Sequence, residues 1–266
     1  MTRRIGLAAI MLALIASLPA SGQGPVVPDR AAFHLYLLVG QSNMAGRGAL
    51  EPGDQDVDPR VLMLDKAGVW VPATDPMHFD KPVAGVGLGR AFAARMRERA
   101  PDVTVGLIPA AVGGSPIDAW QPGVFYEPTR SHPWDDAMAR ARVAMASGTL
   151  QAILWHQGES DATPDLAPAY EAKLHDLIAR FRTALGAPDV PFIVGGLGRY
   201  PDVPWDDARR MVDAAHRTLP DKVRRTAFVS SDGLVHGGDK VHFDTASLRE
   251  LGRRYAAACE ALITMR

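Results

Sequence analysis

The chain has 266 residues, of which 22% are charged and 47% hydrophobic, and its formal net charge is -1 at pH 7. This composition allows a sizeable core, and α/β folds of this length commonly form one domain. No basic stripe or charge run occurs, which argues against a nucleic acid partner. The only cysteine, Cys259, cannot form an internal disulfide, so we expect a buried apolar residue.

The first residues have the layout of an export signal. A pair of arginines near the start precedes an apolar run from 5 to 18, and the small residues at 20–22 fit a cleavage site. A run of about 14 residues is short for a membrane span. We therefore expect a signal peptide at 1–22 and a secreted or periplasmic domain at 23–266 that has no membrane partner after cleavage. An uncleaved membrane anchor is the alternative.

Short apolar runs typical of buried strands alternate with amphipathic segments typical of helices along the rest of the chain. In chain order, the pattern predicts strand 33–39, a small hairpin or edge feature at 61–64 and 69–71, helix 87–99, strand 103–108, helix 134–146, strand 151–155, helix 165–185, strand 191–194, helix 205–219, strand 226–229 and helix 245–263. This alternation predicts an α/β fold with a five-stranded parallel sheet and helices on both of its faces.

Ligands of such folds bind beyond the carboxyl ends of the strands, so the segments that follow the strands matter most. Ser42 follows the first strand on a turn between Gly40 and Gly46. It is either a nucleophile with an adjacent base or a turn or N-cap residue. After the second strand, Gly113 and Gly114 either present backbone N–H groups to an oxyanion or form a plain tight turn.

The third strand is followed by a run of polar residues, HQGESD, at 156–161. The Gln157 amide can donate a hydrogen bond to an oxyanion. Glu159 can orient a histidine or bind substrate. The alternative interpretation is a solvated loop in which Asp161 caps a turn.

Asp239 and His242 lie just before the last predicted helix. A carboxylate three residues before a histidine can reach its Nδ1 in a turn and leave Nε2 free for a hydroxyl. A capping turn is the alternative. His236 adds a second imidazole to this acidic segment, but no specific zinc spacing is present, so we expect neither a metal nor another cofactor.

No GxSxG elbow occurs in the chain, which disfavours the common α/β-hydrolase arrangement. Four segments, taken together, resemble the blocks of the SGNH hydrolase superfamily, and within it the carbohydrate esterase and sialate O-acetylesterase branch, as in carbohydrate esterase family 6. They are GQSNMAG at 40–46, GGSPIDAW at 113–120, WHQGESDA at 155–162 and DKVHFDTAS at 239–247. They occur in the family's order and span most of the mature chain.

The resemblance implies a three-layer α/β/α, flavodoxin-like fold and a serine esterase that removes acetyl groups from a carbohydrate. Ser42 would be the nucleophile, His242 the general base and Asp239 the third member of the triad. The family's oxyanion hole would consist of the Ser42 N–H, a glycine N–H, for which we favour Gly114, and Gln157. Glu159 is a second candidate for supporting the histidine.

Aromatic and basic residues in the long segment after the second strand are candidates for a substrate wall. Trp120 and Tyr126 offer ring faces to a sugar, and Arg130 and His132 offer polar contacts. Packing beneath the loop is the alternative, which we favour for Trp134.

Two other functions compete with a carbohydrate acetylesterase. The first is a non-catalytic carbohydrate-binding protein, which the presence of Ser42, His242 and Asp239 together disfavours. The second is a general short-chain ester hydrolase or lipase, although the chain has no long apolar lid. Acetylated xylan and other plant polysaccharides, O-acetylated sialic acid and acetylated cell-envelope glycans all fit as the partner, and the sequence predicts no oligomeric state.

Overall fold

The computed structural model describes residues 25–264, so the predicted signal peptide lies outside the described residues. Within them, the strands form one seven-stranded sheet in the order β3-β2-β4-β1-β5-β6-β7. Their bounds are β1 (Phe33–Gly40), β2 (Val61–Leu64), β3 (Trp70–Pro72), β4 (Thr104–Pro109), β5 (Thr149–His156), β6 (Phe192–Gly195) and β7 (Thr226–Val229). Neighbouring strands run parallel, except that β3 is antiparallel to β2.

The predicted α/β fold is confirmed, but the predicted number of five strands is wrong. The runs at 61–64 and 69–71 form the expected antiparallel hairpin. However, β2 also pairs in parallel with β4, and the hairpin therefore extends the sheet to seven strands. A short hairpin pattern identifies its own two strands, but it does not reveal which distant strand the outer edge will join.

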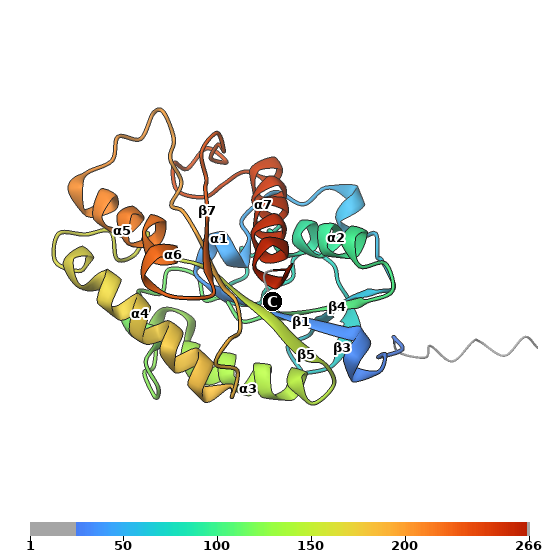
Figure 1. Cartoon of the computed structure of the whole chain (residues 1–266). Coiled ribbons are helices and arrows are strands. Elements are labelled where there is room, and N and C mark those ends of the chain that lie inside the picture. Colours follow the sequence, from blue (N-terminus) through green and yellow to red (C-terminus); the bar gives the residue numbers. More distant parts are fainter. Residues whose placement is uncertain (1–24, 265–266) are drawn as a thin grey trace, which may run out of the picture.

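Helices cover both faces of the sheet (Figure 1). One face carries α1, α2 and α7, and the other carries α3, α4 and α5. Their bounds, with the short α6, are α1 (Ser42–Ala45), α2 (Gly89–Arg99), α3 (Pro133–Met145), α4 (Ala167–Ala184), α5 (Asp207–Arg217), α6 (Leu219–Lys222) and α7 (Thr245–Thr264). Short 3-10 helices lie at Arg30–Ala32, Pro52–Gln55, Ile117–Trp120 and Glu127–Thr129. The predicted helices are confirmed; the one expected at 205–219 corresponds to α5, and its last residue, Leu219, begins α6.

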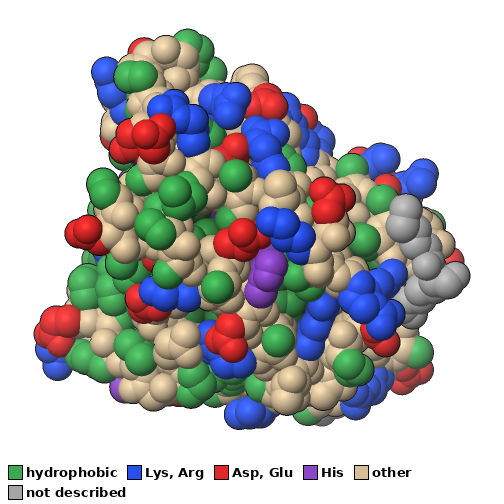
Figure 2. Space-filling model, turned by 60° about the vertical axis from the view of Figure 1, so that its left-hand side comes forward, with side chains coloured by type: hydrophobic (Ala, Val, Ile, Leu, Met, Phe, Trp, Pro, Cys, Tyr) green, Lys and Arg blue, Asp and Glu red, His purple; other side chains and the backbone are tan. Residues whose placement is uncertain are grey.

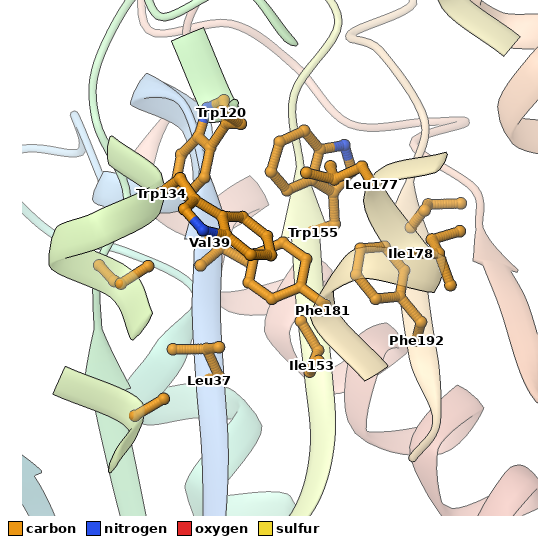
Figure 3. Close-up of a cluster of buried hydrophobic side chains, with 14 of the residues drawn as sticks. Leu37, Val39, Trp120, Trp134, Ile153, Trp155, Leu177, Ile178, Phe181 and Phe192 are labelled. Carbon is orange, nitrogen blue, oxygen red and sulfur yellow. The ribbon is translucent and has the colours of Figure 1, made fainter. Parts of the chain in front are cut away.

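The core beneath α3 and α4 is rich in aromatic side chains (Figure 3). Trp120 and Trp155 pack edge to face with ring centroids 5.1 Å apart, and Trp134 packs on Phe181 at 4.7 Å. Burying a large apolar side chain contributes about 1.5–3 kcal/mol, so this cluster anchors the loop after β4 to the sheet.

The core beneath α2 and α7 contains Tyr36, Phe92 and Tyr255 together with aliphatic residues. Cys259 lies in α7 and is fully buried with a free thiol, which confirms the prediction for this residue. The second core holds α7 firmly, and the loop that carries Asp239 and His242 leads directly into this helix.

The central strand β1 lies between β4 and β5. After β1 the next strands, β2 and β4, are added on one side of it, whereas β5, β6 and β7 are added on the other side, so the order in which strands join the sheet reverses between β1 and β5. Parallel α/β sheets bind ligands at such a reversal. Ser42 follows β1 there, and residues 157–161 follow β5.

Among residues 25–264, no helix combines the length and the apolar character needed to cross a membrane. On the face shown in Figure 2, acidic and basic side chains are interspersed, without a broad area of one sign of charge.

Candidate active site

The turn after β1 places the Ser42 hydroxyl at the sheet edge. Gly40 has a φ of 125°, and a Cβ there would lie 2.1 Å from the carbonyl oxygen of His156. Only glycine fits such a conformation this close to another backbone. Ser42 then begins the short helix α1 and is almost completely buried.

The structure brings Ser42, His242 and Asp239 into one line of hydrogen bonds. The Ser42 Oγ lies 2.8 Å from His242 Nε2, although the two residues are 200 positions apart. On the other side of the ring, His242 Nδ1 lies 2.5 Å from Asp239 Oδ2. A carboxylate at Nδ1 holds the proton there and leaves Nε2 free to accept one from the hydroxyl.

Asp239 is fixed by its own turn. Its Oδ1 accepts hydrogen bonds from the backbone N–H groups of Val241 and His242, at 2.9 and 2.8 Å. Partial burial has the largest influence and raises the pKa of Asp239. The N–H groups of His242 and Val241 and the imidazole together outweigh it and lower this pKa to about 2. The carboxylate is therefore charged at neutral pH.

Glu159, the second candidate for supporting the histidine, has a different partner. Its Oε1 accepts a hydrogen bond of 2.6 Å from Asn43 Nδ2, whereas Asp239 occupies the Nδ1 side of His242. Glu159 Oε1 also lies 4.0 Å from Nε2 of the buried His156. Glu159 thus contacts the turn that carries the hydroxyl rather than the imidazole.

Asn43 connects both halves of the site. Its Nδ2 also donates to the carbonyl of Val241 at 3.2 Å, and its Oδ1 accepts from the N–H of Phe243 at 3.1 Å. These are the residues on either side of His242. The side chain next to Ser42 therefore fixes the backbone that carries the imidazole.

Gln41 performs a similar function toward the segment after β5. The Gln41 side chain is buried, and its Oε1 accepts long hydrogen bonds from the N–H groups of Gly158 and Ser160, at 3.4 and 3.3 Å. The turn at Ser42 is thereby joined to the HQGES segment by Gln41 and Asn43 together.

The two glycines after β4, Gly113 and Gly114, differ in whether the backbone N–H group has a hydrogen-bond acceptor. Gly113 donates to Asp80 Oδ2 at 2.8 Å. In the described part of the chain, the Gly114 N–H has no protein acceptor. The Gly114 carbonyl is held by Tyr126 and Ser160, whose hydroxyls lie 2.7 and 2.9 Å away. These contacts fix the peptide and favour Gly114, with a φ of 82°, as the oxyanion donor.

The structure does not place Gln157 as the free donor that the sequence analysis expects. Its amide nitrogen lies 2.5 Å from Asp161 Oδ2 and 3.2 Å from the Ser115 carbonyl, so both of its N–H groups have protein acceptors. Its Oε1 accepts from the Tyr170 hydroxyl at 2.9 Å. Gln157 is completely buried, and it connects the segment after β5 to the glycine loop.

One residue of the predicted substrate wall, Trp120, lies in the core instead. Trp120 is fully buried in the core, and its indole N–H donates to Ser115 Oγ at 3.0 Å, so its prediction as a sugar contact is wrong. Trp134 is buried beneath the loop, as favoured. Tyr126 contacts the Gly114 peptide, and Arg130 is exposed nearby.

The acidic segment before α7 does not gather ligands around one point. His236 Nε2 lies 3.2 Å from Asp202, while His242 engages Ser42 and Asp239. Among residues 25–264, no three His, Cys, Asp or Glu side chains are arranged to hold a metal ion.

Sequence reasoning missed the roles of Asn43, Gln41 and Asp80. The first two belong to the quoted GQSN segment, but a polar residue beside a serine carries no sign of its partner. Asp80, which binds both Arg47 at 2.7 Å and the Gly113 N–H, lies in a loop that matches none of the four segments.

The sequence of the chain matches the model of a known family. The family model described as "Carbohydrate esterase, sialic acid-specific acetylesterase" matches residues 32–261. The chain belongs to this family. The predicted relationship is thereby confirmed, and the protein is a carboxylic ester hydrolase of the carbohydrate acetylesterase class.

A curated relative and several solved structures are similar to this chain over most of its length. A probable carbohydrate esterase from Arabidopsis thaliana is 30% identical over 261 residues, which cover 89% of this chain and 92% of the relative. A crystal structure of an Arabidopsis thaliana protein has a TM-score of 0.76 at 28% identity and covers 86% of this chain and 98% of its own. NanS has a TM-score of 0.74 at 18% identity, with 90% and 100% covered. A carbohydrate acetylesterase from Xanthomonas citri has a TM-score of 0.68 at 19% identity, with 87% and 57% covered.

Proposed function

We propose that the protein is a serine esterase that removes O-acetyl groups from a carbohydrate through an acetyl-enzyme on Ser42. The observation that supports this most strongly is the hydrogen bond between Ser42 Oγ and His242 Nε2, at 2.8 Å. A serine hydroxyl is a weak nucleophile, and an imidazole at this distance can accept its proton as it attacks.

In the first step, the Ser42 oxygen attacks the acetyl carbonyl while its proton passes to His242 Nε2. The imidazole then carries a positive charge, which the ionised Asp239 stabilises from 2.5 Å. The carbonyl oxygen becomes an oxyanion. The N–H groups of Ser42 and Gly114 are the donors that we assign to it, and each such donor lowers the barrier by about 3 kcal/mol.

In the second step, the tetrahedral intermediate collapses and the sugar oxygen leaves with the proton from His242. Water then attacks the acetyl-enzyme, with His242 again accepting the proton, and acetate leaves as Ser42 regains its hydrogen. The chemistry is proton transfer and acyl transfer only, and these residues supply both.

The substrate class rests on the family. The family description and the name of the Xanthomonas citri enzyme support an acetylated carbohydrate as the partner. Acetylated xylan or another plant polysaccharide and O-acetylated sialic acid are the sugars we propose to test first. We also propose, from residues 1–22, that the enzyme acts outside the cytoplasm.

The test measures acetate released from a panel of acetylated glycans and p-nitrophenol released from p-nitrophenyl acetate. We expect the wild type to hydrolyse the simple ester and at least one glycan, and Ser42→Ala to lose both activities. Equal release by the wild type and Ser42→Ala would favour a carbohydrate-binding protein. Hydrolysis of the simple ester without any glycan would favour a general short-chain ester hydrolase.

A further inference from the structure

A cavity of about 450 Å³ lies behind the glycine loop and plays no part in the acyl transfer described above. Ala111 and Val112 form one wall, and the chain continues from them into Gly113 and Gly114. Asp80, another lining residue, accepts a hydrogen bond of 2.8 Å from the Gly113 N–H. The cavity therefore adjoins the glycine loop that carries the oxyanion donor proposed above.

Exposed aromatic rings gather at this cavity. Phe79 lines it and has 39% of its surface exposed. Phe125, which is 46% exposed, packs with its ring 5.2 Å from that of His132, another lining residue. The remaining phenylalanines of the described chain are buried or half-buried. Exposed apolar side chains that cluster beside a cavity indicate a surface that contacts a ligand.

The Phe79 ring is held in place from one side. The Arg140 guanidinium lies over the ring, 4.6 Å from its centroid. That guanidinium is itself fixed by hydrogen bonds to the carbonyls of Pro109, Asp65 and Leu64. Phe79 remains 39% exposed while its ring is fixed in this way, and a preorganised flat apolar surface suits the C–H face of a pyranose.

A strained arginine adds polar donors to the same cavity. Arg130 lines it and has a φ of 50°, in the left-handed region that non-glycine residues seldom adopt. Such strain concentrates at sites that bind ligands. The only ion pair of its side chain among the described residues is with Glu127 at 3.5 Å, and both are largely exposed. An exposed pair contributes little, so the guanidinium is available to sugar hydroxyls.

We propose that this cavity is a second sugar subsite, which binds the residue next to the acetylated one in an oligosaccharide. Phe79 supplies the stacking surface, and Arg130 donates hydrogen bonds to hydroxyls. The volume lies within the range of small-ligand sites. This inference rests on the proposed acetylesterase function and deepens it, because it assigns the enzyme an oligosaccharide or polysaccharide rather than a free monosaccharide.

The test compares kcat/KM for acetylated xylotriose with that for acetylated methyl xyloside, and p-nitrophenyl acetate reports whether the esterase works at all. In the wild type we expect the three-ring substrate to be favoured by about tenfold, the effect of roughly 1.4 kcal/mol of extra binding. Phe79→Ala and Arg130→Ala should each reduce this preference by about three- to tenfold, mainly through KM.

Two control variants separate contact from general disturbance. Phe79→Tyr keeps the ring and should retain the preference. Arg224→Ala removes an arginine that is, like Arg130, 80% exposed and paired with an exposed carboxylate, and it should also retain the preference.

The two proposals fail differently. If the wild type hydrolyses none of the three esters, the proposed esterase function is wrong. If it hydrolyses p-nitrophenyl acetate and both sugars without a preference for the longer one, the subsite is wrong and the esterase stands. A preference that persists unchanged in Phe79→Ala and Arg130→Ala would also overturn the subsite.

Discussion

Replacing Asp239 by asparagine tests how the imidazole is held. In the native site, Oδ1 accepts from the N–H groups of Val241 and His242, while Oδ2 faces His242 Nδ1. Asparagine has one carbonyl oxygen, and the two backbone donors will retain it. Its NH₂ group then faces Nδ1, which favours the tautomer with the proton on Nε2. The Nε2 proton then points at Ser42 Oγ, so Nε2 cannot accept the proton of the Ser42 hydroxyl.

The expected loss follows from two contributions. The pKa of Asp239 is lowered from 3.8 to about 2, and one pKa unit corresponds to about 1.4 kcal/mol. Because 52% of this side chain is exposed, solvent screening reduces the interaction to about 1–1.5 kcal/mol, or roughly tenfold in rate. The wrong tautomer adds to this, and a buried triad loses about 10⁴-fold in total. We therefore expect kcat/KM to fall by about 100- to 1,000-fold.

The assay is kcat/KM for p-nitrophenyl acetate at pH 7 to 8, with thermal unfolding as a check on folding. The matched control is Asp202→Asn, since Asp202 is similarly exposed and hydrogen-bonded to a histidine, His236, outside the proposed triad. The control should retain wild-type activity. If Asp239→Asn stays within threefold of the wild type, or if Glu159→Gln alone causes the large loss, Asp239 is not the group that supports the imidazole.

Four further predictions concern the surroundings of the site. Asn43→Ala removes the hydrogen bonds on both sides of His242, and we expect kcat to fall by about 10- to 100-fold at similar KM; an unchanged kcat argues against this connection. Gln157→Ala removes one hydrogen-bond partner each from the buried Asp161 and Tyr170, so turnover should fall and the unfolding temperature should drop by about 4–10 °C; a loss of turnover of about 100-fold at an unchanged unfolding temperature would instead indicate an oxyanion donor. Gly40→Ala places a Cβ 2.1 Å from the His156 carbonyl, so poor expression or a markedly lower unfolding temperature is expected, and wild-type stability would be contrary to this geometry. Burial lowers the pKa of His78 to about 3. The unfolded chain therefore takes up this proton first as the pH falls below about 6.5, and stability is lost toward pH 3. His78→Asn should reduce this loss by up to about 1.4 kcal/mol per pH unit between pH 6 and 4 in denaturant titrations, and an identical pH dependence would refute it.

The elements of the fold were predictable because most depend on local pattern. The buried runs at β1, β4 and β5 and the helices between them follow from periodicity alone. The pairing of β2 with β4 was not predictable from local pattern. Parallel pairing joins residues about forty positions apart, and no local pattern shows which distant residues will pair. Local pattern therefore identified the strands but undercounted the sheet.

The site residues also differ in how far the sequence predicts their position. Ser42, Asp239 and His242 carry chemical groups whose combination predicts acyl transfer, and the structure brings them together. Trp120 failed as a sugar contact because a large ring satisfies a core as readily as a binding surface, and sequence does not distinguish the two. Gln157 was misplaced because its amide satisfies buried partners, Asp161 and Tyr170, that only the folded chain reveals.

The most direct test of the central claim is to look for the acetyl group on Ser42. The enzyme is mixed with p-nitrophenyl acetate, quenched in acid within the first turnovers, digested and examined by mass spectrometry. The account predicts one added acetyl group on the peptide that contains Ser42, and its absence in Ser42→Ala. An acetyl group found on another residue during turnover, with Ser42→Ala still active, would contradict it.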